Sequence, residues 1–417
     1  MHRRQFLQTG IAMTLAAERF AAHPLSAAAD AAPAMAISDR FKRLKAPVTG
    51  RPVIQLTAGD AQCYHMYYYL PSITADNRYL VYHKAAGGEL QLHRLELATA
   101  ESVQLTHATC EDTQWRPWCV DSGRGVLDHR SALNLARGLA VYFDGRQVRA
   151  VNIASLRDEP LFEVAADRDA YGQTACTPDG QWFLFTHVPK GATWGKPCEG
   201  AEVAAYHFDT GRVQTLCRID SAVFHVTDYD NEHFVVTHPA DGPGMMLTDF
   251  TSGACKMLRN GVVHCPTTAR GIAYEVPDER RLGLLDPLSA RWFEFLMPEP
   301  FQYIHTGCDP AGRIFFYENS TGWDQFDEHD MYALVRLDRQ HRKHTWLRLT
   351  GTWPTYIGGQ KSHFHPRITP DRKWILFTGG DAATETCHLF LLDISDLTDS
   401  EGIGPHLLSA TGENDLV

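Results

Sequence analysis

The chain has 417 residues, of which 44% are hydrophobic and 21% are charged, a composition typical of globular proteins. Its formal net charge is -11 with histidine neutral, which argues against a general nucleic-acid binder, because such a protein presents a basic face to the phosphates. A small anionic substrate is compatible with this charge, since a local cation or arginine cluster can outweigh the overall field.

The first residues have the pattern of a twin-arginine export signal. Arg3 and Arg4 precede Phe6, Leu7 and a short apolar run that is too interrupted to span a bilayer. We therefore expect residues 1–36 to be removed and the mature protein to be periplasmic or secreted. A disordered cytoplasmic tail is the alternative. No later segment is long and apolar enough for a membrane helix.

Ten cysteines are scattered along the chain, and none form a C-x-x-C pair. The sequence therefore lacks the ligand spacing of a structural zinc ribbon. It does not define a disulfide pairing.

A short unit recurs along the chain, namely a polar turn followed by an apolar or aromatic strand. The turns are Thr74–Asn77, Asp121–Arg124, Thr177–Gly180, Asp228–Asn231, Thr268–Gly271, Asp309–Gly312 and Thr369–Asp371. Their spacing of roughly 40–60 residues, with almost no helical periodicity, indicates an all-β protein. Four-stranded units of this length are typical of propeller blades.

We therefore predict that residues 37–417 form one domain, a seven-bladed β-propeller of four-stranded antiparallel blades. A pair of β-sandwich domains is the alternative, but the chain lacks a Pro/Gly-rich linker at its middle. The segment from Asp327 to Tyr332 is expected to form one helical turn.

Histidines precede several of the turns, where the innermost strand of each blade should lie. They are His65, His225, His264, His305 and the pair His363 and His365. Side chains at matching positions of successive blades converge near one axis, so this pattern predicts a binding or catalytic site. A water-filled channel without chemistry is the alternative.

The pair His363 and His365 is the strongest local signal. In an extended segment the side chains at i and i+2 point to the same face, which suits ligation of one metal ion by neutral imidazoles. Gln360 lies three residues earlier and joins them if the chain bends. The alternative is a polar loop in which both histidines bond backbone groups.

Three other residues are weaker candidates for binding a substrate. Arg116, between two tryptophans, could hold a carboxylate, although stacking between these rings is the simpler role. His225 and His238 lie in the fourth repeat. The chain contains neither a G-x-S-x-G nor a G-x-G-x-x-G motif, so a serine hydrolase or a dinucleotide enzyme lacks support.

The segment Gln360–Pro366 resembles the last-blade motif Q-x-x-H-x-H-P of the oligogalacturonate lyases, which are seven-bladed propellers that bind manganese. Near the start, Gln55–Thr57 and Cys63–Tyr69 resemble the family's R-L-T and C-H-R-N-Y-F-Y. The resemblance implies that the metal ligands are His305, Gln360, His363 and His365. It also implies that His264 is the catalytic base.

The sequence departs from the family at two places. Met245 or Met246 aligns with a substrate-binding arginine, and Tyr64-His65 replaces a His-Arg pair. Both changes concern recognition of the substrate carboxylate, so they affect the identity of the uronide more than the class of reaction.

The resemblance implies a metal-dependent lyase that cleaves short uronate oligosaccharides, such as oligogalacturonates, by β-elimination to 4,5-unsaturated products. The metal would polarise the carboxylate, and a neutral histidine would take the C5 proton. Nitrogen and oxygen ligands suit Mn²⁺, and Zn²⁺, Ni²⁺ and Co²⁺ would also bind. His65, Arg116, His225 and His238 are the candidates for substrate contacts.

Two other functions stay open. One is a non-catalytic, TolB-like periplasmic propeller for protein interaction, and the other is a lyase or epimerase for another uronide. The sequence does not give the oligomeric state.

Overall fold

The computed structural model describes most of the chain after the expected export signal. The described residues are 33–111, 123–192, 198–219, 225–237, 244–268, 271–276, 279–289, 291–297, 305–308, 314–320, 328–338, 343–354, 363–398 and 415–416. None of the helices within these ranges is long and apolar enough to cross a membrane.

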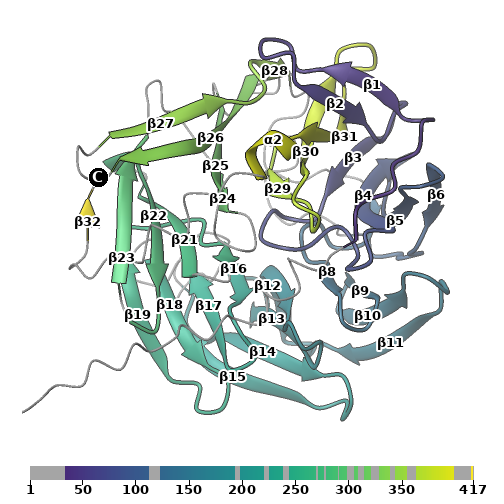
Figure 1. The fold of residues 1–417 in the computed structure, drawn as a ribbon. Helices are drawn as coiled ribbons and strands as arrows, with labels where there is room; N and C mark the ends of the chain where they lie inside the picture. Colours follow the sequence, from purple (N-terminus) through teal and green to yellow (C-terminus); the bar gives the residue numbers. More distant parts are fainter. Residues whose placement is uncertain are drawn as a thin grey trace, which may run out of the picture.

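Seven antiparallel sheets follow one another around a common centre, and each contains at least four strands. Figure 1 shows them as the blades of a ring, coloured in chain order. The predicted all-β, seven-bladed propeller is therefore confirmed.

The blades are numbered here in chain order, and their strands are given in the order of each sheet. The first blade contains β3 (Gln62–His65), β4 (Tyr79–Ala86), β5 (Glu89–Glu96) and β6 (Glu101–Gln104). The second blade contains β8 (Ala132–Asn134), β9 (Leu139–Asp144), β10 (Gln147–Asn152) and β11 (Asp158–Glu163). The third blade contains β12 (Arg168–Cys176), β13 (Trp182–Pro189), β14 (Ala201–His207) and β15 (Val213–Ile219). The fourth blade contains β16 (His225–Asp228), β17 (His233–Thr237), β18 (Gly244–Asp249) and β19 (Cys255–Asn260). The fifth blade contains β20 (Thr267–Thr268), β21 (Gly271–Val276), β22 (Arg281–Asp286) and β23 (Arg291–Leu296). The sixth blade contains β24 (Thr306–Cys308), β25 (Phe315–Ser320), β26 (Glu328–Asp338) and β27 (Lys343–Arg348).

The seventh blade joins the two ends of the propeller. It contains β29 (Arg367–Ile368), β30 (Trp374–Asp381), β31 (Thr386–Asp393), β2 (Pro52–Gln55) and β1 (Lys42–Lys45). Ile54 of β2 pairs with Leu391 of β31, and both side chains are buried. An early strand therefore completes the sheet begun by late ones, which closes the ring and fixes the seventh blade beside the first.

Short additional elements flank this framework. They are β7 (Arg124–Gly125) beside β5, β28 (Trp353–Pro354) beside β26, β32 (Asp415–Leu416) beside β23, and α2 (Ser395–Thr398) after the last long strand.

One turn structure recurs between the first two strands of three blades. In the third blade, Thr177 Oγ1 donates to Asp179 Oδ1 at 2.6 Å and accepts from the backbone N–H of Trp182 at 3.0 Å. Equivalent bonds begin at Thr74 in the first blade and at Thr369 in the seventh. The backbone N–H of each threonine also donates to the carbonyl oxygen of the residue five positions later, so the threonine side chain supplies the second bond of that pair where the strand reverses. This is why the Thr-x-Asp pattern marks blades in the sequence.

The structure corrects two expectations. The segment Asp121–Arg124 does not start the second blade, because β7 at its end pairs with β5 of the first blade. The second blade's turn lies instead at residues 135–138, between β8 and β9. The helical turn expected at Asp327–Tyr332 is also wrong: from Glu328 onward the chain forms β26, in which Met331 and Ala333, two residues apart, are both buried.

Two glycines provide a test of the turn geometry. Gly180 lies in the turn between β12 and β13, and Gly138 lies in the turn between β8 and β9, with φ of +70° and +64°. A Cβ at Gly180 would lie 2.6 Å from Asn134 Oδ1, whereas one at Gly138 would meet nothing within 4 Å. Gly138→Ala should cost about 1–2 kcal/mol, the price of a left-handed backbone, and Gly180→Ala about 1–3 kcal/mol more through overpacking. Thermal unfolding of both variants measures the difference, and equal midpoints would contradict the explanation.

Candidate metal centre

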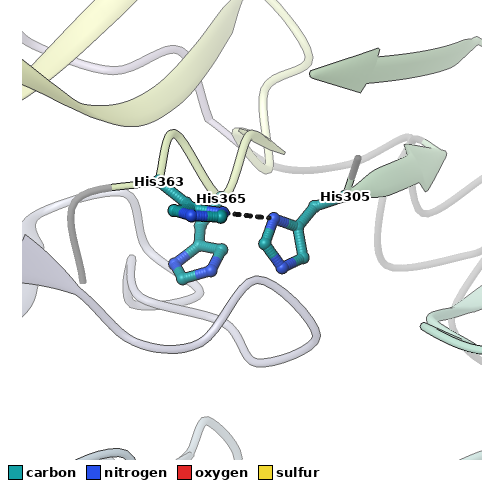
Figure 2. Close-up of side chains that lie close together, drawn as sticks. All are labelled: His305, His363 and His365. Atoms are coloured by element: carbon teal, nitrogen blue, oxygen red, sulfur yellow. Dashed lines mark hydrogen bonds between the residues drawn. The ribbon is translucent and has the colours of Figure 1, made fainter. Parts of the chain in front are cut away.

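Three buried imidazoles meet where the sixth and seventh blades adjoin. His305 directly precedes β24, and His363 and His365 precede β29. One ring nitrogen from each lies within 4.8 Å of the other two. Figure 2 shows the pair facing His305, with a dashed line for the 3.4 Å contact between Nδ1 of His363 and Nδ1 of His305. The expected convergence of these histidines is therefore found.

The backbone achieves this convergence in a way that the spacing did not predict. His365 has a φ of 45°, so the segment is not an extended strand. Phe364, between the two histidines, is buried with its ring 5.0 Å from that of Phe377. The left-handed residue and this anchored ring direct both imidazoles to one place, at a cost of about 1–3 kcal/mol for the backbone.

A buried carboxylate lies against the three imidazoles. Glu318 on β25 bonds Nδ1 of His305 through Oε1, which also lies 3.4 Å from Nδ1 of His363. Its Oε2 accepts the backbone N–H of His365 at 2.9 Å. Glu318 is fully buried, and the sequence analysis missed it. The feature of the sequence that could have indicated Glu318 is its position directly after the aromatic residues of β25.

His264, the expected base, lies beside this cluster. Its ring centroid is 4.6 Å from that of His305, and it too has a left-handed backbone, with a φ of 51°. Its Nδ1 lies 3.0 Å from Oε2 of Glu275, a buried residue of β21. Glu275 Oε1 accepts the backbone N–H of Thr306 at 2.8 Å. Glu275 was also missed, although it is an acidic residue inside an apolar strand.

The segment that follows β3 in the first blade, residues 66–70, covers the histidines with aromatic rings. The ring centroid of Tyr67 is 4.9 Å from that of His365, and the ring centroid of Tyr68 is 4.9 Å from that of His305. Both tyrosines are buried. The cluster therefore lies in a low-dielectric environment in which electrostatic interactions are strong.

The structure brings two of the four expected substrate-contact residues close to the cluster. His65 Nε2 lies 3.3 Å from the carbonyl oxygen of Phe364. The ring of His225 lies 5.3 Å from that of Tyr67 and 6.1 Å from that of His264. Arg116 and His238 lie outside the described residues, as does the expected ligand Gln360.

Two further histidines near the cluster were not predicted. His129, just before β8, lies 6.2 Å from His365 between ring centroids and has a φ of 56°. It was missed because the second blade's boundary was misplaced. His329 of β26 lies 4.9 Å from His363 between ring centroids.

The positions that depart from the family motif have structural roles. Met245 on β18 is fully buried and packs in an apolar cluster with Tyr229 and Val235. Tyr64 stacks on His83 at 4.9 Å, and its hydroxyl donates to Asp128 Oδ1 at 2.8 Å.

Burial keeps the imidazoles of His264, His305 and His365 in the neutral form that metal binding and proton transfer require. It lowers the pKa of His305 and of His365 well below the usual value, and neighbouring histidines lower both further. It lowers the pKa of His264 to about 3. Burial also raises the pKa of the Glu275 carboxyl, opposed by the N–H of Thr306. Neutral imidazoles backed by a buried carboxylate suit a divalent transition-metal ion.

Comparison with known proteins agrees with the fold and the motif. No family model matches the sequence. The chain is 24% identical to the oligogalacturonate lyase of Dickeya dadantii, over 82% of this chain and 93% of that protein. The crystal structure of an oligogalacturonate lyase from Vibrio parahaemolyticus has a TM-score of 0.68 at 17% identity, covering 87% of this chain and 99% of that one.

A second solved structure, of an oligogalacturonate lyase in complex with manganese, also has a TM-score of 0.68, at 20% identity, and covers 86% of this chain and 98% of that one. Over most of its length, the chain is thus related in sequence and in fold to the oligogalacturonate lyase family.

Proposed function

We propose that the protein is a metal-dependent lyase that cleaves short uronate oligosaccharides, of the oligogalacturonate type, by β-elimination to 4,5-unsaturated products. The observation that carries the proposal is the convergence of His305, His363 and His365 on one point, with His264 beside them. The names of the relatives support the substrate class.

The proposed cation is Mn²⁺, because a structural relative is a manganese complex, and other divalent transition metals fit the same donors. His305, His363 and His365 would hold it, together with Gln360 as the motif implies. When bound, it would draw electron density from the uronate carboxylate and stabilise the negative charge that develops during elimination.

His264 is the proposed base. Because burial lowers its pKa to about 3, its imidazole is neutral near pH 7 and has a lone pair that can accept the C5 proton. The electrons of the C5–H bond then form the C4–C5 double bond, and the C4–O bond breaks with its electron pair on the leaving oxygen. His65 and His225, which lie close by, are proposed to contact the sugar.

Residues 1–36 are proposed to direct export by the twin-arginine route, so that the enzyme would meet its substrate in the periplasm or outside the cell. Experiments can distinguish the proposed function from two alternatives. A TolB-like scaffold would bind no metal, and a lyase or epimerase for another uronide would differ in a panel of alginate-, ulvan- and pectin-derived oligosaccharides.

Metal binding is tested by His363→Ala. Loss of one buried ligand should abolish stoichiometric Mn²⁺ in elemental analysis and remove the stabilisation by added Mn²⁺, which is about 2.7 kcal/mol at 100 times the dissociation constant. The matched control is His388→Ala, since His388 is a buried histidine of the same blade that bonds Thr57 and the carbonyl oxygen of Gly59. The control should lower stability and keep the metal. Wild-type protein without metal would contradict the proposal.

The base is tested by His264→Ala. We expect kcat on di- and trigalacturonate, followed by ultraviolet absorbance of the unsaturated product, to fall by about 10²–10⁴-fold. Mn²⁺ stoichiometry should be unchanged, because His264 is not a proposed ligand. Undiminished turnover in this variant would exclude His264 as the base, and no turnover of any uronide by metal-loaded wild type would exclude the proposed reaction.

A further inference from the structure

Two glutamates form the same arrangement in neighbouring blades. Glu275 of the fifth blade bonds Nδ1 of His264 at 3.0 Å and accepts the backbone N–H of Thr306 in the sixth blade at 2.8 Å. Glu318 of the sixth blade bonds Nδ1 of His305 and accepts the backbone N–H of His365 in the seventh blade at 2.9 Å. Each carboxylate thus links the histidine of its own blade to the corresponding segment of the next blade.

The matching position is not acidic in the two blades on either side. In the fourth blade, Thr237 occupies it, and its Oγ1 lies 2.9 Å from Nδ1 of His225. In the seventh blade, Thr378 donates its backbone N–H to Phe364 at 2.9 Å. Of these four blades, the acidic residue therefore occurs in the two that carry the proposed base and the proposed ligand His305.

We propose that Glu275 and Glu318 are positioning residues that set the tautomers of His264 and His305, the first for proton transfer and the second for metal binding. The part of the proposal that concerns Glu275 rests on the proposed lyase function, whereas the part that concerns Glu318 requires only that the cluster binds a metal.

The carboxylate determines which ring nitrogen of its histidine carries the hydrogen. Burial raises the pKa of the Glu275 carboxyl, and a cation held by the adjacent His305 would favour its ionised form. An ionised carboxylate has lone pairs and no proton to donate, so in the metal-loaded protein the Nδ1 atom bonded to it must carry the hydrogen. The Nε2 atom of the same ring then has the lone pair. In His264 this is the atom that can take a proton from carbon, and in His305 it is the atom that can bind a cation.

The second contact of each glutamate makes glutamine a sharp probe. A backbone N–H can only donate, so in a glutamine variant the amide oxygen must stay on Thr306 or on His365. The amide NH₂ then faces Nδ1 of the histidine and can bond it only if Nδ1 has the lone pair. The proton moves to Nε2, and the ring is held in the wrong tautomer while the shape of the site is kept.

For Glu275→Gln we expect kcat on digalacturonate to fall by about 10²-fold or more, because the base is lost. KM, Mn²⁺ stoichiometry and the thermal midpoint should be unchanged. If wild type is active and this variant keeps its kcat, the role of Glu275 is overturned. An inactive wild type would instead overturn the proposed function.

For Glu318→Gln we expect Mn²⁺ affinity, measured by calorimetry without substrate, to fall by about 10–100-fold. An unchanged affinity overturns the role of Glu318. The matched control is Glu294→Gln, which removes a buried carboxylate of the fifth blade that bonds Tyr274 and Arg259 but touches none of the proposed site residues. It should lower the thermal midpoint and keep both Mn²⁺ affinity and kcat.

If a glutamine variant does not fold, the tautomers of His264 and His305 can be measured in the wild-type protein. In ¹⁵N-histidine spectra of the zinc-loaded protein, the signals of residues 264 and 305 are assigned by their loss in His264→Gln and His305→Gln. Hydrogen on Nδ1 in both rings supports the proposal. Hydrogen on Nε2 of either ring overturns it.

Discussion

The site depends on the contact between buried carboxylates and the N–H groups of the neighbouring blade. An ionised carboxylate in a protein interior costs several kcal/mol unless hydrogen bonds or charges compensate it. Glu318 obtains this compensation from His305, His363 and the backbone of His365, that is, from two blades at once. The two blades must therefore keep their relative position for the acid to remain buried, so the geometry of the imidazole cluster and the packing of the propeller are coupled.

The propeller provides this coupling through repetition. In the second, fifth and seventh blades a histidine lies just before the first strand, and these residues, His129, His264 and His365, all have a positive φ. A left-handed backbone at a residue other than glycine is held only where its surroundings determine it fully. Closure of the ring by β2 and β31 supplies part of that determination, because it fixes the seventh blade, which carries His363 and His365.

The sequence predicted what repetition makes visible and missed what only the three-dimensional structure defines. Thr-x-Asp turns and aromatic strands recur in sequence, so the blades and most of their histidines could be found. His129 was missed because the sequence of Asp121–Arg124 resembles a blade turn, whereas Arg124 and Gly125 form β7, which adds a strand to the first blade. Glu275 and Glu318 could not be assigned roles, because the N–H groups that they accept lie 31 and 47 residues away, in other blades.

The two carboxylates also constrain the proposed chemistry. A uronate is an anion, and without a cation it would approach two buried acidic groups in a chain whose net charge is already -11. Repulsion between like charges is strong at low dielectric, so neutral imidazoles alone do not make such a site attractive to the substrate. A divalent cation among His305, His363 and His365 would offset the negative charge of the site and would favour the ionised form of Glu275, whose pKa is raised by burial. The same ion would then balance the charge of the two acids and offer the substrate carboxylate a coordination site. On this proposal, metal binding and substrate binding are linked by electrostatics.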